Sequence, residues 1–363
     1  MSTLRQHSYA LIFALVTVAG AGSGCSGCKG LGGGGVPKDD MALVPKEAEV
    51  LFATNFARVR NTTMWRKLLD LLDSDVQMKK DYEDFVKKCA FDPMVSLESV
   101  FAGFPQGMTE SKEFVMIVRG PFNEPKLVEC ATEQFKKDGG DMAVSEYGGK
   151  KLYTNTRSSQ AFATFLDAKT VAIGGKDWIK KTIDLATGKK AEGQTELPKS
   201  VRDNAEVMAI HKRVRTTDGV WGLGLVSQTT RDSLKDDPNL SVASTMKLVF
   251  GSFDFANGIN ADLNADLGSN QDATDLTTKI QGQLAEARKN PQFMMAGIGT
   301  FLDNVKIEAR QATFHVGIVF NQPQVDDLIN RMKGLLASLR GSLTGGLAPA
   351  QAPAPIDPPG TTP

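Results

Sequence analysis

Cysteine and histidine are the side chains of this 363-residue chain best suited to nucleophilic or metal chemistry, and the chain holds only four Cys and three His. His7 lies in a predicted targeting segment, so His211 and His315 are left and a metal site of three histidines is excluded. Because no nucleophile can be tied to either histidine from the sequence, we predict no catalytic residue, no metal site and no bound cofactor. This scarcity favours a non-enzymatic protein.

The motifs of common catalytic and nucleotide-binding folds are missing from the chain. It has no G-x-x-x-x-G-K-[ST] phosphate loop and no G-x-S-x-G nucleophile elbow, and the glycines of 30–35 precede neither a strand nor a helix. The segment 262–266 resembles the start of a calcium loop, but Leu267 stands where that loop needs Gly and Ala273 where it needs Glu. The alternation of polar and apolar residues over 259–267 instead predicts a half-exposed antiparallel strand.

Residues 1–24 have the three parts of a secretory signal peptide: Arg5, the apolar run Tyr9–Ala21, and a small-residue exit. The apolar run is shorter than the roughly 20 residues that a transmembrane helix needs. Gly22-Ser23-Gly24-Cys25 resembles a bacterial lipobox, in which the Cys thiol receives diacylglycerol before cleavage, although Gly22 stands where an aliphatic residue is usual. Cleavage after Ala21, at an A-x-A site, is the alternative. We predict an acylated Cys25, whose several acyl chains would anchor the protein stably in a membrane.

The segments that flank the predicted core should not pack into it. Residues 25–42 form a Gly-rich flexible tether that carries Cys28 as a second thiol, and residues 344–363 form a Pro-rich disordered tail. The formal net charge of +0 argues against a nucleic-acid partner, which would need a basic surface. Paired lysines recur in the first half, but the acids between them predict a mixed, solvated face.

Between these ends the sequence predicts two similar α+β modules, related by internal duplication, at residues 43–197 and 198–343. The first should open on a strand at Ala48–Ala53 and the second on a strand at Ala205–Ile210, with Trp65 and Trp221 following at nearly the same distance. Later elements recur in one order: a strand pair, an amphipathic helix, hairpin-like strands and a last helix. Each module is predicted as an antiparallel sheet with helices packed on one face.

Apolar residues at helical spacing indicate where the helices lie. Trp65, Leu68, Leu69 and Leu72 form one stripe, and Asn61-Thr62-Thr63 supplies an N-cap before it. Further amphipathic helices are expected at residues 75–89, 125–137, 178–187, 272–288 and 325–339.

Cys89 and Cys130 remain in the exported protein, and both fall near helix ends or faces of the first module. Two thiols in one module tend to pair in an oxidising envelope, so we predict a Cys89–Cys130 disulfide, with free buried thiols as the alternative. Closing a loop of about 40 residues would stabilise the fold by roughly 3–4 kcal/mol in the chain-entropy model.

Short motifs of the chain resemble those of uncharacterised bacterial envelope lipoproteins with a duplicated α+β domain. They are the Cys25 lipobox, the strand entry at 44–50, Cys89-Ala90-Phe91-Asp92-Pro93 and Arg119-Gly120-Pro121-Phe122 before a helix. The resemblance covers about residues 43–340 and implies no activity, so it supplies no catalytic residue.

The predicted function is therefore that of a non-enzymatic envelope protein, which binds an envelope protein or an apolar ligand or serves as a structural element. We expect it in the bacterial cell envelope, lipid-anchored at the outer membrane and facing the periplasm or the cell surface. The alternative is an envelope hydrolase or transferase with a site between the two modules.

Overall fold

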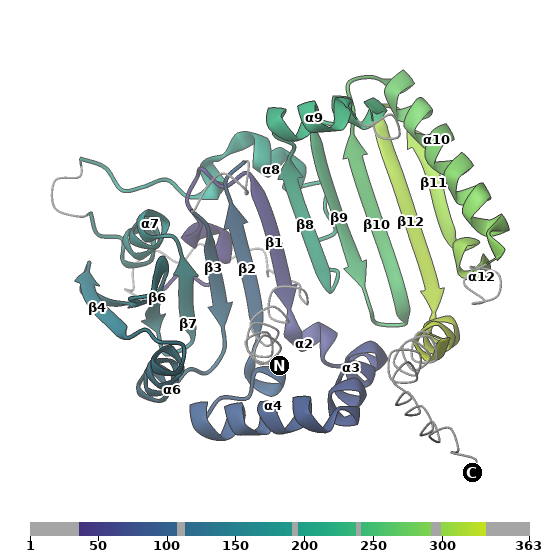
Figure 1. The fold of residues 1–363 in the computed structure, drawn as a ribbon. Helices are drawn as coiled ribbons and strands as arrows, with labels where there is room; N and C mark the ends of the chain where they lie inside the picture. Colours follow the sequence, from purple (N-terminus) through teal and green to yellow (C-terminus); the bar gives the residue numbers. More distant parts are fainter. Residues whose placement is uncertain (1–35, 107–112, 191–194, 237–240, 292–298, 332–363) are drawn as a thin grey trace, which may run out of the picture.

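The computed structural model describes residues 36–106, 113–190, 195–236, 241–291 and 299–331. The described chain forms one 12-stranded sheet with helices around it (Figure 1). Every pair of neighbouring strands is antiparallel. The predicted α+β class with an antiparallel sheet is therefore confirmed.

The first half of the chain supplies strands β1 to β7. In chain order its elements are η1 (Asp40–Leu43), β1 (Val50–Asn55), α2 (Phe56–Val59), α3 (Thr63–Ser74), α4 (Val76–Cys89), α5 (Pro93–Ser96), β2 (Ser99–Phe104), β3 (Val115–Arg119), α6 (Glu124–Lys137), β4 (Met142–Tyr147), β5 (Lys150–Asn155), β6 (Ser158–Asp167), β7 (Thr170–Gly174) and α7 (Lys176–Thr187).

The second half supplies strands β8 to β12. Its elements are η2 (Val201–Asp203), α8 (Ala205–His211), β8 (Val220–Leu225), α9 (Gln228–Lys235), η3 (Ser241–Thr245), β9 (Leu248–Asp254), β10 (Gly258–Asp266), α10 (Asn270–Lys289), α12 (Gly299–Leu302), β11 (Val305–Arg310), β12 (Thr313–Asn321) and a helix over 322–331.

Helix α3 begins where the sequence predicts. The Thr62 hydroxyl accepts a hydrogen bond from the Trp65 N–H at 3.2 Å, which satisfies one of the free donors of the first turn. Trp65 is buried, and Leu68 and Leu69 pack into the same apolar cluster. The predicted helix and its apolar stripe are confirmed.

The strand predicted at Ala205–Ile210 is wrong, because these residues form helix α8. Asn204 is the N-cap, and its side-chain oxygen accepts from the Val207 N–H at 3.2 Å. Val207 and Ile210 are one helical turn apart and both are buried. The strand of the second half that pairs with β1 is β8, so Trp221 lies on a strand whereas Trp65 lies on a helix.

The strand order is β11-β12-β10-β9-β8-β1-β2-β3-β7-β6-β5-β4. Outward from the centre, β1-β2-β3-β7-β6 in the first half matches β8-β9-β10-β12-β11 in the second, with β4 and β5 added at one edge. An internal duplication would give such a match, and the duplication itself stays a prediction. The two predicted modules share one sheet, because β1 and β8 pair from Val50↔Gly224 to Thr54↔Val220.

Helices pack on both faces of the first half of the sheet, not on one. On one face, here called the α7 face, Trp178, Ile179 and Ile183 of α7 join a core with Leu51 and Ile117 of the sheet. The opposite face is here called the α10 face.

Two clusters lie on the α10 face. In the first half, α2 and α3 cover strand residues such as Val100 and Val118. In the second half, Ala273 and Leu276 of α10 cover strand residues that include Ala265.

Candidate functional site

An apolar strip crosses the α10 face of the sheet between the cluster under α3 and the cluster under α10. The strand register sets its central row: Phe52 of β1 lies opposite Gly222 of β8, Gly222 opposite Gly251 of β9, and Gly251 opposite Leu263 of β10. Val50, Gly224, Val249 and Phe253 complete the strip on the same strands and face. Every member is apolar or glycine, so the strip offers no side-chain hydrogen bond to a ligand.

Glycines at its centre keep the strip flat. A Cβ at Gly222 would lie 3.6 Å from Phe52 Cδ2, and a Cβ at Gly251 would lie 2.7 Å from Leu263 Cδ2. Leu263 therefore occupies the space that a side chain at Gly251 would need, whereas a Cβ at Gly222 would be in ordinary contact with Phe52. A glycine inside a strand often marks such a close approach.

The strip is partly open among the residues that the structure describes. Val249 is 39% exposed although it lies on an interior strand of the sheet. Val50, Phe52, Phe253 and Leu263 are half-buried. A sheet face of this kind is normally either covered or polar, so a partly open apolar one is a candidate binding surface.

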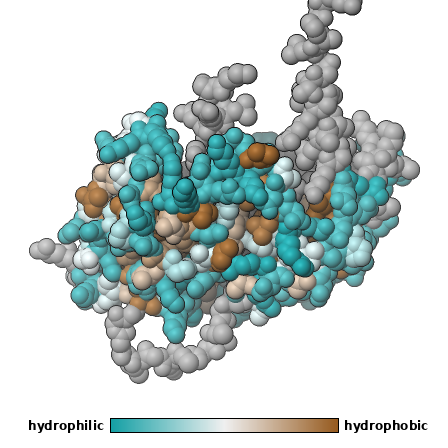
Figure 2. Space-filling model, turned by 90° about the horizontal axis from the view of Figure 1, so that it is seen from below, coloured by the Kyte–Doolittle hydropathy of each residue, from teal (hydrophilic) through white to brown (hydrophobic). Residues whose placement is uncertain are grey.

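The lower end of the molecule has a different surface. Figure 2 views it from below and shows hydrophobic atoms in separate patches between hydrophilic side chains. Val76 is the first residue of α4, Val95 lies within the four-residue helix α5, and the two side chains are 84% and 63% exposed. Single exposed apolar residues are ordinary in proteins and do not define a site.

On the reverse, α7 face, the outer strands of the second half, β10 to β12, carry polar side chains. Strand β10 places Asn260, Asp262, Asn264 and Asp266 on this face, in the alternation that the sequence predicts for a half-exposed strand. Arg213 Nη2 donates to Asp266 Oδ1 at 2.8 Å, and this contact holds the pKa of the Asp266 carboxyl below its usual range. Asp262 lies 3.5 Å from Arg215 Nη2, so both acids of the calcium-like segment are strand residues paired with arginine.

His315 of β12 is buried on this polar face between two carboxylates. Its Nε2 lies 3.6 Å from Asp262 Oδ2, and its Nδ1 lies 3.3 Å from Glu308 Oε1. Neither ring nitrogen makes a hydrogen bond of good geometry in the described chain, so no hydroxyl or thiol is activated by it there. The carboxylates face opposite nitrogens, so the three side chains do not converge on one position for a metal ion.

The other sequence-predicted candidates also lack a reactive arrangement. His211 ends α8 and packs edge to face on Trp221, with ring centroids 5.2 Å apart. Burial lowers the pKa of His211, and the nearby Arg202 charge adds to this shift. Within the described ranges no group of three or more His, Cys, Asp or Glu could hold a metal ion, and no helix is long and apolar enough to cross a membrane.

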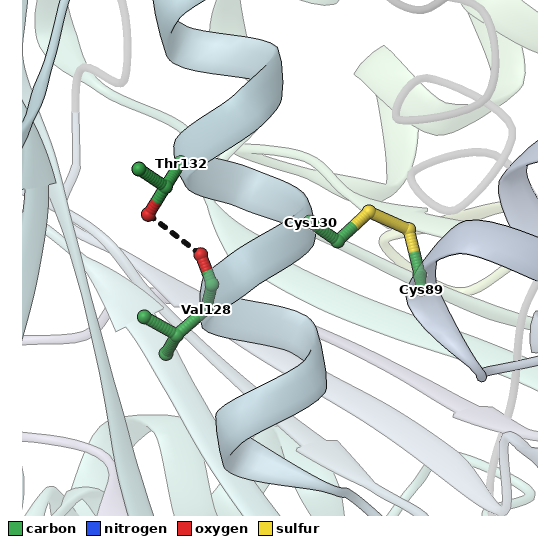
Figure 3. The surroundings of a disulfide bond; sticks show 4 residues. All are labelled: Cys89, Val128, Cys130 and Thr132. Carbon is green, nitrogen blue, oxygen red and sulfur yellow. Dashed lines mark hydrogen bonds between the residues drawn. A yellow bond between two sulfur atoms is a disulfide. The ribbon is translucent and has the colours of Figure 1, made fainter.

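Cys89 and Cys130 form a disulfide between two helices (Figure 3). Cys89 is the last residue of α4 and Cys130 lies in the middle of α6, with Cα atoms 5.1 Å apart. Cys89 is the buried residue of α4, whose other apolar side chains stay partly exposed. The bond therefore ties a weakly packed helix to α6, which is a structural role.

The paired lysines lie on a mixed surface. Lys79 pairs with Asp73 at 3.0 Å, and Lys181 pairs with Glu47. At the ends of α4 and α6, Lys88 lies close enough to lower the pKa of Lys137. Both lysines occupy the last turn of their helix, where the helix dipole favours a positive charge.

Among the residues that the structure describes, a cavity between α2 and the β9–β10 turn has a volume of about 80 Å³. Arg58, Thr62 and Phe255 are among its lining residues. Ligand pockets commonly measure roughly 300–1,000 Å³, so this one is too small for a substrate of ordinary size.

Several predicted features lie outside the described residues: the signal peptide, the acylation site Cys25, Cys28, and the Pro-rich tail 344–363.

The apolar strip was not predicted from the sequence. The isolated glycines 222, 224 and 251 inside strand patterns were the signal that could have indicated it.

Neither a protein-family model nor a curated protein matches the chain. Among solved structures, crystal form III of TP0453 is similar at 14% identity and a TM-score of 0.46, over 82% of this chain and 99% of that chain. Crystal form I of TP0453 is similar at 15% identity and a TM-score of 0.40, over 82% and 98%. Likeness at this level carries no argument about function.

Proposed function

We propose that the protein is an envelope lipoprotein, anchored in a membrane through acylated Cys25, and that its folded part binds an apolar ligand or partner without catalysing a reaction. One observation carries the binding function: the partly open apolar strip through Phe52, Val249 and Leu263. Burying apolar surface contributes roughly 25 cal/mol per Å², so even a shallow strip can hold an alkyl or aromatic group.

The alternative of an envelope enzyme with a site between the two modules draws no support from the described residues. At the junction, β1 and β8 are paired strands of one sheet. The buried His315 makes no hydrogen bond with a hydroxyl or thiol in the described chain.

The strip is tested with an uncharged apolar fluorescent probe, N-phenyl-1-naphthylamine, and the full chain in solution. Val249→Lys places a charge in the strip and should weaken probe binding at least tenfold. Val319→Lys is the matched control. Val319 is also an exposed strand valine, 59% exposed where Val249 is 39% exposed, but it lies on the polar face. Equal binding by the two variants, or no binding by the parent protein, would contradict the proposal.

The anchor is tested separately, by the intact mass of the protein from membranes. Acylation predicts a mature chain that starts at Cys25 and carries the added mass of its acyl chains, and Cys25→Ser should move the protein to the soluble fraction. A mature chain that starts at Gly22 with unmodified thiols would contradict the anchor and leave the binding strip untouched.

A further inference from the structure

Strand β4 lies at one edge of the sheet, and no described element lies beyond it in Figure 1. The opposite edge, β11, carries Lys306, Glu308 and Arg310, and α10 packs beside it. Charged side chains and a covering helix are devices that keep an edge strand from pairing with another chain. Strand β4 has Glu146 as its single charge and no proline, so its edge lacks such protection.

The backbone groups that face outward from β4 follow from its hairpin with β5. Gly148 and Gly149 have φ of 57° and 76° and form a two-residue turn between Tyr147 and Lys150. In such a hairpin the two residues that flank the turn are hydrogen-bonded to each other, and every second residue repeats this pattern. Consistently, Asp141 O accepts from the Thr156 N–H at 2.9 Å. The N–H and C=O groups of Met142, Val144 and Glu146 therefore point to the open edge.

The hairpin of β4 and β5 is held by side-chain hydrogen bonds on both faces. On the α7 face, the Tyr147 hydroxyl donates to Asp184 Oδ2 at 3.0 Å. On the α10 face, Val144 lies opposite Tyr153, whose hydroxyl donates to Glu124 Oε1 of α6 at 2.5 Å. Val144 itself is 53% exposed. The edge is thus an ordered template with an exposed apolar residue at its centre.

We propose that β4 pairs antiparallel with β4 of a second copy of this chain, so that the two sheets join into one across a two-fold axis. The outward N–H and C=O groups of one β4 strand must hydrogen-bond to the outward groups of the other. This requirement defines the register. Val144 pairs with the partner subunit's Val144, and Met142 pairs with the partner subunit's Glu146. This register uses all the outward groups of both strands.

Self-complementarity is what favours a second copy over a foreign peptide. The two-fold axis brings valine against valine at the centre, and each Glu146 faces a methionine, so no like charges lie opposite one another. A two-fold interface requires such a self-complementary patch. Pairing also gives the outward N–H and C=O groups of β4 backbone partners in place of water.

The oligomeric state of the full chain, measured by native mass spectrometry after release from detergent, is the first test. We expect a dimer for the parent protein and for Val319→Lys, whose exposed valine lies on strand β12, far from β4 in the sheet order. Val144→Lys should be monomeric, because two like charges would then lie directly opposite each other. A single cooperative thermal unfolding transition would show that Val144→Lys still folds.

Hydrogen exchange gives the second readout. In the parent protein the amides of Met142, Val144 and Glu146 should exchange at least tenfold more slowly than in Val144→Lys, while those of Ala143 and Ser145 should be little changed. A monomeric parent protein, a dimeric Val144→Lys, or protection of the outward amides without a dimer would each overturn the proposal.

Discussion

Phe101 of β2 and Trp221 of β8 pack edge to face, with ring centroids 5.8 Å apart and an interplanar angle of 70°. Phe101 belongs to the first predicted module and Trp221 to the second, and both are buried in one cluster. The core therefore continues across the junction between the two halves of the chain.

The shared core predicts a single cooperative unfolding transition for both halves. Trp221→Ala should destabilise the protein by about 3–5 kcal/mol, because it removes a large buried side chain and leaves a cavity. Urea denaturation followed by circular dichroism measures the change, and hydrogen exchange should show both halves losing protection together. Two separate transitions would contradict the prediction. Val95→Ala, at a residue 63% exposed, is the control and should change stability little.

The Cys89–Cys130 disulfide closes a loop with a sequence separation of 41 residues. Replacing both cysteines by alanine should lower the free energy of unfolding by roughly 3–4 kcal/mol, because the unfolded chain regains the freedom that the loop removes. Urea denaturation of the parent protein should respond to a reductant, and the double variant should not. Peptide mapping without reductant that finds both thiols alkylated would contradict the bond.

The Arg213–Asp266 pair predicts a pH-dependent contribution to stability. The pKa of Asp266 is lowered in the folded protein, first by the hydrogen bond from Arg213. The stabilisation is therefore present above the unfolded aspartate pKa of about 3.9 and is lost as the pH falls through the lowered folded value. Arg213→Gln should cost about 1 kcal/mol or less at pH 7, since the pair is partly exposed.

The difference between the parent protein and Arg213→Gln should shrink as the solution is acidified below pH 4, which thermal unfolding can follow. A difference that stays constant down to pH 2 would instead assign the effect to the contact of the Arg213 guanidinium with the Phe250 ring, at 4.4 Å.

His211 predicts a pH dependence in a different range. Burial lowers the pKa of His211, so the folded protein holds this side chain neutral where an exposed histidine would bind a proton. Its contribution to stability is complete above the unfolded pKa of about 6.5 and declines as the pH falls below it. His211→Asn should therefore lose less stability than the parent protein between pH 7.5 and pH 5. Parallel curves for the two proteins over this range would contradict the prediction.

Local interactions explain which elements the sequence could predict. Helix α3 has a capping Thr62 and an apolar stripe, and β10 alternates apolar and polar residues. Both elements were therefore predictable from neighbouring residues. The sequence predicts a strand at helix α8 because a short apolar run fits both the two-residue period of a strand and the 3.6-residue period of a helix. The informative signal was Asn204, whose side chain caps the helix.

The candidate site was beyond such reasoning, because its residues are far apart in the chain. Phe52 and Leu263 lie in different predicted modules, and they share one face only because β1 pairs with β8, β8 with β9, and β9 with β10. The sequence likewise placed both thiols on helices, but the packing of α4 beside α6 set their Cα atoms 5.1 Å apart.

The sequence by itself determined the α+β class, most helices and strands, and the scarcity of catalytic groups, because periodicity, capping and composition act over a few residues. Tertiary structure alone decided that one sheet spans both halves, that helices cover both faces of the first half, and that an apolar strip stays partly open. Strand pairing between distant segments depends on how the whole set of buried surfaces fits together, and no local pattern records that fit.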